Sequence, residues 1–96
     1  MNEGEIIKKL KKEFKEVYIW EDKPNIIYKK HSHSYKTKLL IVNGNMIIKK
    51  EGKEIDIKSG DSIIINRNEL HEAIIGSNGC KYIVAEKEKT TWTSTS

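Results

Sequence analysis

The sequence predicts an all-β sandwich or barrel that follows one amphipathic helix. The chain has 96 residues, enough for one domain, and 36% of them are hydrophobic, which is enough for a compact core. Apolar residues near the start recur at helical spacing, and from Val17 onward short strand-like runs alternate with turn signals. Together these observations indicate a small β domain with a helical lead-in.

The N-terminal segment is the only one with helical periodicity. Its apolar residues recur at three- and four-residue steps with Lys and Glu between them, and they are Ile6, Ile7, Leu10, Phe14 and Val17. This spacing predicts that residues 1–16 form an amphipathic helix that packs on one end or edge of the sheet. A membrane-surface role is disfavoured because several glutamates dilute the basic face.

Residues 17–86 contain the predicted strands. The runs are Val17–Glu21, Ile26–Lys30, Lys36–Val42, Asn45–Lys50, Lys53–Ile57, Ser62–Ile65, His71–Ile75 and Cys80–Ala85. Turn residues separate them, and Asn43-Gly44 suits a type I′ hairpin because both central residues adopt positive φ. A second turn is predicted at 76–79. Strands closed by turns at such short intervals indicate a sandwich or a barrel.

Two of these runs, 39–42 and 63–65, are apolar at consecutive positions, so both of their faces should be covered. One face can line the barrel, and the other must meet the helix or a second subunit. A domain of this size is also marginally stable alone, so we expect a homodimer. The polar segment 87–96 is predicted to be a disordered tail.

Composition bears on location and partners. No apolar run approaches the roughly 20 residues that span a bilayer, and the start lacks the pattern of a signal peptide. Cys80 is the single cysteine, so no disulfide framework is expected. These features predict a cytoplasmic protein without membrane association.

The net charge of +4 raises the question of nucleic-acid binding. Of the 18 basic residues only Arg67 is an arginine, whereas surfaces that read phosphates and bases usually rely on arginine. The lysines alternate with glutamates, which is typical of a solvated surface. A nucleic-acid partner is therefore not expected.

The three histidines are the most informative residues. His31 and His33 are two positions apart at the end of a strand-like run, so their side chains project from the same face. His71 opens a later strand and provides a third imidazole if the fold brings it close. Imidazole suits Zn, Cu, Fe and Ni, and three ligands leave coordination positions open. The alternative is that an isolated His-x-His pair is only a surface or hydrogen-bonded pair.

Both histidine segments resemble the motifs of the cupin superfamily, in particular its short single-domain members. The first motif is matched by His31-Ser32-His33, with Thr37 where a glutamate is expected and Gly44 at its end. The second is matched by Gly60-Asp61, with Asn66-Arg67-Asn68 in place of Pro-x-Gly and then His71 at the expected spacing. The resemblance covers about 17–85. It implies a jelly-roll β-barrel that holds one divalent transition metal ion (Fe, Mn, Ni, Cu or Zn) in its mouth.

Two departures from the motifs matter. Thr37 replaces the usual carboxylate ligand, and a hydroxyl neither binds a divalent ion well nor neutralises its charge. The expected site is therefore a neutral, more open one formed by His31, His33 and His71. Asn66 and Asn68 replace the Pro and Gly of the second motif, and because Asn tolerates left-handed backbone the turn is expected to persist.

Other side chains receive weaker assignments. Cys80 is expected to be an inert thiol. Glu69, in the turn before His71, is a candidate acceptor or base beside the site, whereas Glu72 should face solvent. Residues near Ile27, Ile41, Ala73 and Ile75 are expected to cap the cavity. Tyr35 and Tyr82 are candidates to line it, with packing in the barrel wall as the default interpretation.

Three functions are compatible with such a site. The first is a metal-dependent enzyme of dioxygenase or isomerase type that acts on a small molecule. The second is a non-catalytic domain that binds or senses a small ligand, although the single short helix cannot form a helix-turn-helix. The third is a vestigial cupin without metal. The sequence does not decide between them, because one fold hosts many chemistries.

Overall fold

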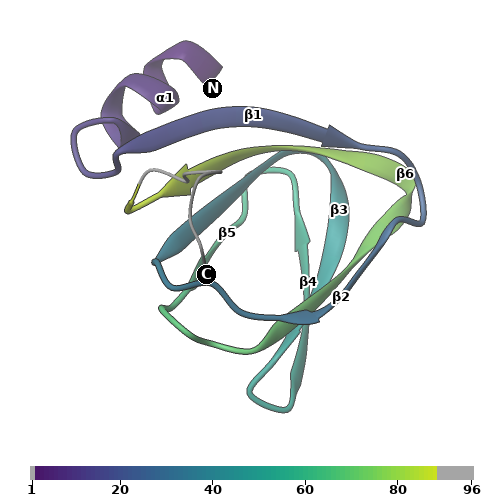
Figure 1. Cartoon of the computed structure of the whole chain (residues 1–96). Coiled ribbons are helices and arrows are strands. Elements are labelled where there is room, and N and C mark those ends of the chain that lie inside the picture. Colours follow the sequence, from purple (N-terminus) through teal and green to yellow (C-terminus); the bar gives the residue numbers. More distant parts are fainter. Residues whose placement is uncertain (1, 89–96) are drawn as a thin grey trace.

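The computed structural model describes residues 2–88 and shows one antiparallel sheet that curls around a central interior (Figure 1). Its strands follow the order β1-β6-β3-β4, while β2 pairs with β6 and β5 pairs with β3. The elements are α1 (Glu3–Leu10), β1 (Glu16–Asp22), β2 (Ile27–His31), β3 (Thr37–Lys50), β4 (Lys53–Lys58), β5 (Ser62–Ile65) and β6 (His71–Glu86). The predicted all-β class with one short N-terminal helix is confirmed.

Helix α1 is shorter than the predicted segment 1–16. The Asn2 side chain caps it by accepting a hydrogen bond of 2.8 Å from the backbone N–H of Gly4. After Leu10 the chain tightens into turns, in which Phe14 donates its N–H to the carbonyl of Leu10. Phe14 is nevertheless buried, so the last apolar position of the predicted helix packs on the sheet from the turn after α1.

Helix α1 covers the outer face of β1, β6 and β3. Its cluster consists of Ile6, Ile7, Leu10, Phe14, Val17, Leu40, Val42, Ile83 and Ala85. Leu40 and Val42 belong to the consecutive apolar run in 39–42, so α1 provides the second cover that the run requires. A second subunit is therefore not needed to cover this run. The expected homodimer stays a prediction.

The predicted hairpin at Asn43-Gly44 and the predicted turn at 76–79 are wrong. Strand β3 continues through the first, and β6 continues through the second. The two strands pair along both halves, with register shifts on either side of Gly44. The inward side changes phase there: the buried residues are Leu39 and Ile41 before the bend of β3 and Met46 and Ile48 after it. A phase change of this kind is typical of β-bulges at barrel corners.

Gly44 and Gly79 meet at this corner. Gly44 has a φ of +80°, and a side-chain carbon at this position would collide with the carbonyl oxygen of Gly79. Only glycine therefore fits where β3 crosses β6 most closely. The Asn43-Gly44 sequence therefore forms part of a bend that β3 and β6 share.

A polar network lies around Asp22 within the largely apolar barrel. Asp22 accepts hydrogen bonds from the hydroxyls of Tyr28 (2.8 Å) and Tyr82 (2.6 Å) and from the indole N–H of Trp20 (2.9 Å). These donors satisfy the carboxylate. Cys80 is buried nearby, and burial raises the pKa of its thiol to about 11, which fits the expected inert cysteine.

The predicted tail falls at the end of the described chain. Lys87 donates its backbone N–H to the carbonyl of Lys36 and its ammonium to the carbonyl of Glu13, and residues 89–96 lie outside the described part. Within residues 2–88 the structure contains no helix of the length and apolar character that a bilayer crossing requires.

Candidate metal centre

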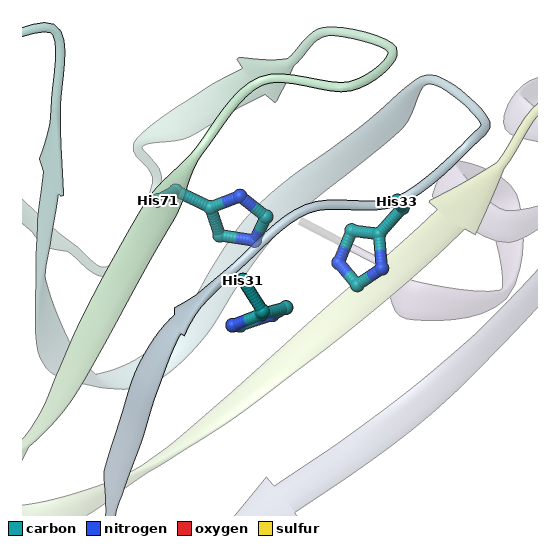
Figure 2. Close-up of side chains that lie close together, drawn as sticks. All are labelled: His31, His33 and His71. Carbon is teal, nitrogen blue, oxygen red and sulfur yellow. The ribbon is translucent and has the colours of Figure 1, made fainter.

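The three histidines come from neighbouring segments at one end of the barrel. His31 is the last residue of β2, His71 is the first of β6, and the two are paired across the strands. His33 follows β2 by two residues. Figure 2 shows the three rings gathered beside one another. Their centroids are separated by 4.2 Å for His31–His71, 4.9 Å for His31–His33 and 5.0 Å for His33–His71. The structure thus brings all three predicted residues together.

One ligand nitrogen from each ring lies within 4.8 Å of the others. Two nitrogens bound at about 2.1 Å to an ion of tetrahedral geometry lie about 3.4 Å apart. The most widely separated rings would therefore have to close by about 1 Å to share one ion, through rotation of their side chains. This group could hold a metal ion.

Backbone carbonyls orient two of the rings. Nδ1 of His31 lies 2.6 Å from the carbonyl oxygen of Lys29, and Nδ1 of His71 lies 2.8 Å from that of Glu69. A carbonyl only accepts, so Nδ1 carries the proton and donates it, and Nε2 keeps its lone pair. Metal-binding histidines in proteins commonly hold their second nitrogen in this way.

The surroundings of His33 and His71 favour the neutral imidazole. Burial, together with the neighbouring histidines, lowers the pKa of His33 to about 4. The pKa of His71 is also lowered, mainly by burial, and its side chain is only 4% exposed. Neutral imidazole is the form that binds a metal ion, so little proton competition is expected at His33 and His71 near neutral pH.

The loop before His71 is fixed by a half-buried ion pair. Lys50 Nζ lies 3.2 Å from the Glu69 carboxylate and also donates to the carbonyl of Ile64. The N–H of Asn66 donates to the same carboxylate, and this hydrogen bond is the main reason why the pKa of Glu69 is lowered. Glu69 is thus an acceptor beside the site through its backbone carbonyl, which His71 contacts, while its carboxylate secures the loop.

Asn68 connects the two histidine segments. It adopts the left-handed conformation, with a φ of +61°, as the motif departure at this position predicts. Its N–H donates to the carbonyl oxygen of His33 at 2.6 Å. The turn of the second motif is thereby attached directly to the segment of the first motif that follows β2.

Replacing Lys50 with methionine is expected to lower the free energy of unfolding by about 1–3 kcal/mol, because the half-buried Glu69 carboxylate would lose its cation. The two side chains are 13% and 12% exposed. Urea unfolding measures the loss. The control is Lys53→Met, an exposed lysine in the next strand, for which we expect a change within about 0.5 kcal/mol. Equal effects in the two variants would contradict this role of the pair.

A cavity of about 510 Å³ opens beside the histidines and extends into the barrel. Its lining includes the three histidines and is otherwise mostly apolar and aromatic, with Glu16, Tyr18, Trp20, Tyr28, Thr37, Leu39, Met46, Ile48, Ile65, Ala73, Tyr82, Val84 and Glu86. Thr37 is 4% exposed, and within residues 2–88 its hydroxyl oxygen has no hydrogen-bond partner. Glu86 is 6% exposed.

Several weaker assignments can now be compared with the structure. Ala73 and Tyr82 line the cavity as expected, whereas Tyr35 stacks on His33 with a centroid separation of 5.2 Å. Ile41 and Ile75 are fully buried in the core. Ile27 is 67% exposed, so the expectation that it closes the cavity is wrong. Glu72 is half-buried on the other face of β6 from His71.

Residues 13–85 match the family model of the AraC-like ligand binding domain. The chain is a cupin of this family.

Solved structures agree on the fold of this cupin. KdgF from a Halomonas species has a TM-score of 0.68 at 15% identity, covering 76% of this chain and 68% of its own. A cupin-2 domain protein from Shewanella frigidimarina has a TM-score of 0.65 at 15% identity, covering 75% and 69%. The DMSP lyase DddQ from Ruegeria pomeroyi has a TM-score of 0.70 at 17% identity, covering 78% and 40%. No curated protein sequence matches the chain significantly.

The cupin motifs locate the histidines, but they do not indicate where the cavity carries charge. Thr37 occupies the usual glutamate position in β3, and its partner across the ladder is Glu86, the last residue of β6. Sequence reasoning missed Glu86. Strand alternation could have indicated it, because Glu86 has the same parity as the cavity residues Tyr82 and Val84.

Proposed function

We propose that this cupin binds one divalent transition metal ion through His31, His33 and His71 and holds a small molecule in the cavity beside the ion. The observation that carries the proposal is the convergence of three imidazoles, two of them with Nδ1 held by a backbone carbonyl. Fe, Mn, Ni, Cu and Zn all accept imidazole ligands, so the proposal is not restricted to one metal.

Each part of the chain has a role in this proposal. The histidines would supply three neutral ligands, and Thr37 adds no charge at the position where a glutamate would complete the set. The apolar walls exclude water from a small molecule in the cavity. When bound, an ion with open positions supplies Lewis acidity or a place for O₂, the chemistry of isomerases and dioxygenases.

Elemental analysis and metal titration of the purified protein test the proposal. We expect one transition metal ion per chain after dialysis, or saturation at one equivalent on titration with Zn²⁺ or Ni²⁺. At a free metal concentration of 100 times Kd, binding should stabilise the folded state by about 2.7 kcal/mol, visible as a higher melting temperature. Absence of both binding and stabilisation would overturn the proposal in favour of a vestigial cupin.

The match to a ligand binding domain family favours a second candidate, a domain that binds a small molecule without converting it. Measuring O₂ uptake and isomerisation of the metal-loaded protein with small dicarbonyl and thiol compounds separates the two. Turnover that depends on the metal supports the enzyme. Saturable binding without turnover across this panel supports the binding domain.

A further inference from the structure

The cavity is much larger than a metal ion requires. Its volume is about 510 Å³, whereas one water molecule takes up about 30 Å³ of the liquid. A volume of this size is typical of pockets that enclose a whole small molecule. A ligand that fills the cavity therefore extends well beyond the ion, and the lining away from the histidines determines what its far end can be.

Three aromatic side chains form one wall of the cavity, and we call them the aromatic wall. They are Trp20 of β1, Tyr28 of β2 and Tyr82 of β6, and they lie together because all three donate hydrogen bonds to Asp22. Tyr28 precedes His31 by three residues in β2, which corresponds to about 10 Å along a strand. The aromatic wall thus lies deeper in the barrel than the histidines.

The polar atoms of the aromatic wall are already used within the protein. Asp22 accepts hydrogen bonds from the indole N–H of Trp20 at 2.9 Å and from the hydroxyls of Tyr28 at 2.8 Å and Tyr82 at 2.6 Å. Burial and the hydrogen bond to Asp22 raise the pKa of both tyrosines, so their hydroxyls stay protonated and continue to donate. A hydroxyl-rich ligand group would find few partners here in exchange for its hydrogen bonds to water.

The aromatic wall also leaves apolar surface open. Trp20 lines the cavity and is nevertheless 49% exposed. Apolar side chains complete the lining around it, among them Leu39, Met46, Ile48 and Ala73. Burying a ring the size of a phenylalanine side chain in such surroundings is enough for a gain in affinity of at least about 10-fold.

We propose that the ligand of this cupin is a small molecule with a chelating group at one end and an apolar ring at the other, and that the ring binds against Trp20, Tyr28 and Tyr82. The chelating group lies at the three histidines. The inference rests on the proposed function in that it assigns a ligand class to the same cavity. It excludes a sugar from the inner part of the cavity, because the aromatic wall offers stacking without hydrogen bonds.

Two hydroxamates with the same chelating head test the inference on the full chain loaded with Zn²⁺. Benzohydroxamate carries a phenyl ring, and acetohydroxamate carries a methyl group in its place. Isothermal titration calorimetry measures both affinities, and we expect benzohydroxamate to bind at least about 10-fold more tightly. Equal or reversed affinities would overturn the inference and leave the metal-binding proposal standing.

A second titration examines the aromatic wall after removal of metal with a chelator. NMR follows the methyl signals of Met46, Ala73 and Val84, which line the cavity, during addition of toluene or methyl glucoside. We expect toluene to bind at least about 10-fold more tightly than the sugar. A preference for the sugar, or binding of neither probe, would overturn the inference. This titration decides the question even if the histidines bind no ion.

Two matched variants in β1 locate the effect. Trp20→Ala removes one ring of the aromatic wall and should weaken benzohydroxamate about fivefold, while acetohydroxamate stays within about twofold. Ile19→Ala is the control, because Ile19 is 41% exposed and by alternation faces away from the cavity. It should change neither affinity. Equal losses in the two variants would reduce the effect to a general disturbance of β1 and overturn the site, and the probe pairs on the unmodified chain remain decisive if a variant fails to fold.

Discussion

Replacing Gly44 with alanine is expected to lower the free energy of unfolding by at least about 3 kcal/mol, a large part of the stability of a domain of this size. The new methyl group would collide with the carbonyl oxygen of Gly79, which is backbone and cannot rotate away as a side chain would. The φ of +80° adds strain for any residue with a side chain. Because β3 and β6 carry both halves of the barrel through this corner, relieving the clash requires moving both strands.

The control is Gly52→Ala, in the turn between β3 and β4. Gly52 has a similar φ of +71°, but a side-chain carbon there meets nothing within 4 Å. In this variant only the backbone strain at positive φ should lower the free energy of unfolding, by about 1–2 kcal/mol. Urea unfolding of the two variants side by side isolates the cost of the clash, and equal losses would show that the corner is not tightly packed.

Replacing His71 with alanine is expected to lower the affinity for Zn²⁺ or Ni²⁺ by more than about 100-fold, which exceeds the typical effect of losing a partner outside the coordination sphere. His71 is the ring nearest to His31, at 4.2 Å, and it is the most buried of the three. Its loss leaves two ligands from one segment, a chelate that water and buffer compete with easily. Competition with a chromophoric chelator measures the affinity.

Glu72→Gln is the matched control for His71→Ala. Glu72 is the next residue of β6, and by alternation it faces away from the histidines. This variant should bind metal within about twofold of the parent, since a distant surface charge adds little at physiological salt. Unchanged affinity in His71→Ala, with a spectrum that shows the fold retained, would rule out a shared three-histidine site.

The histidines were predictable for two different reasons. His31 and His33 share a face because strand side chains alternate, which is a local property that the sequence displays. The approach of His71 depends on pairing across β2 and β6, and only the motif resemblance indicated it. The carbonyls that hold both Nδ1 atoms could not be predicted, because they depend on the local backbone direction at the end of β2 and in the loop before β6.

The errors at Asn43-Gly44 and at 76–79 share one physical cause. Turn residues and a break in alternation are local signals, and they accompany a hairpin or a bulged bend equally well. What keeps each strand continuous is the long ladder between β3 and β6, whose partners are distant in sequence. The position of Glu86 opposite Thr37 also depends on that ladder.

The hydrogen bond from Asn68 to the carbonyl of His33 affects how quickly the three-histidine site can take up and release a metal ion. It joins the loop after β2 to the loop before β6. The Lys50–Glu69 pair immobilises the loop before β6 as well. The rings are thus preorganised by folding, so capturing an ion should require little further loss of conformational entropy. Uptake and release of metal should then proceed by small ring rotations, on a timescale far shorter than that of opening the barrel.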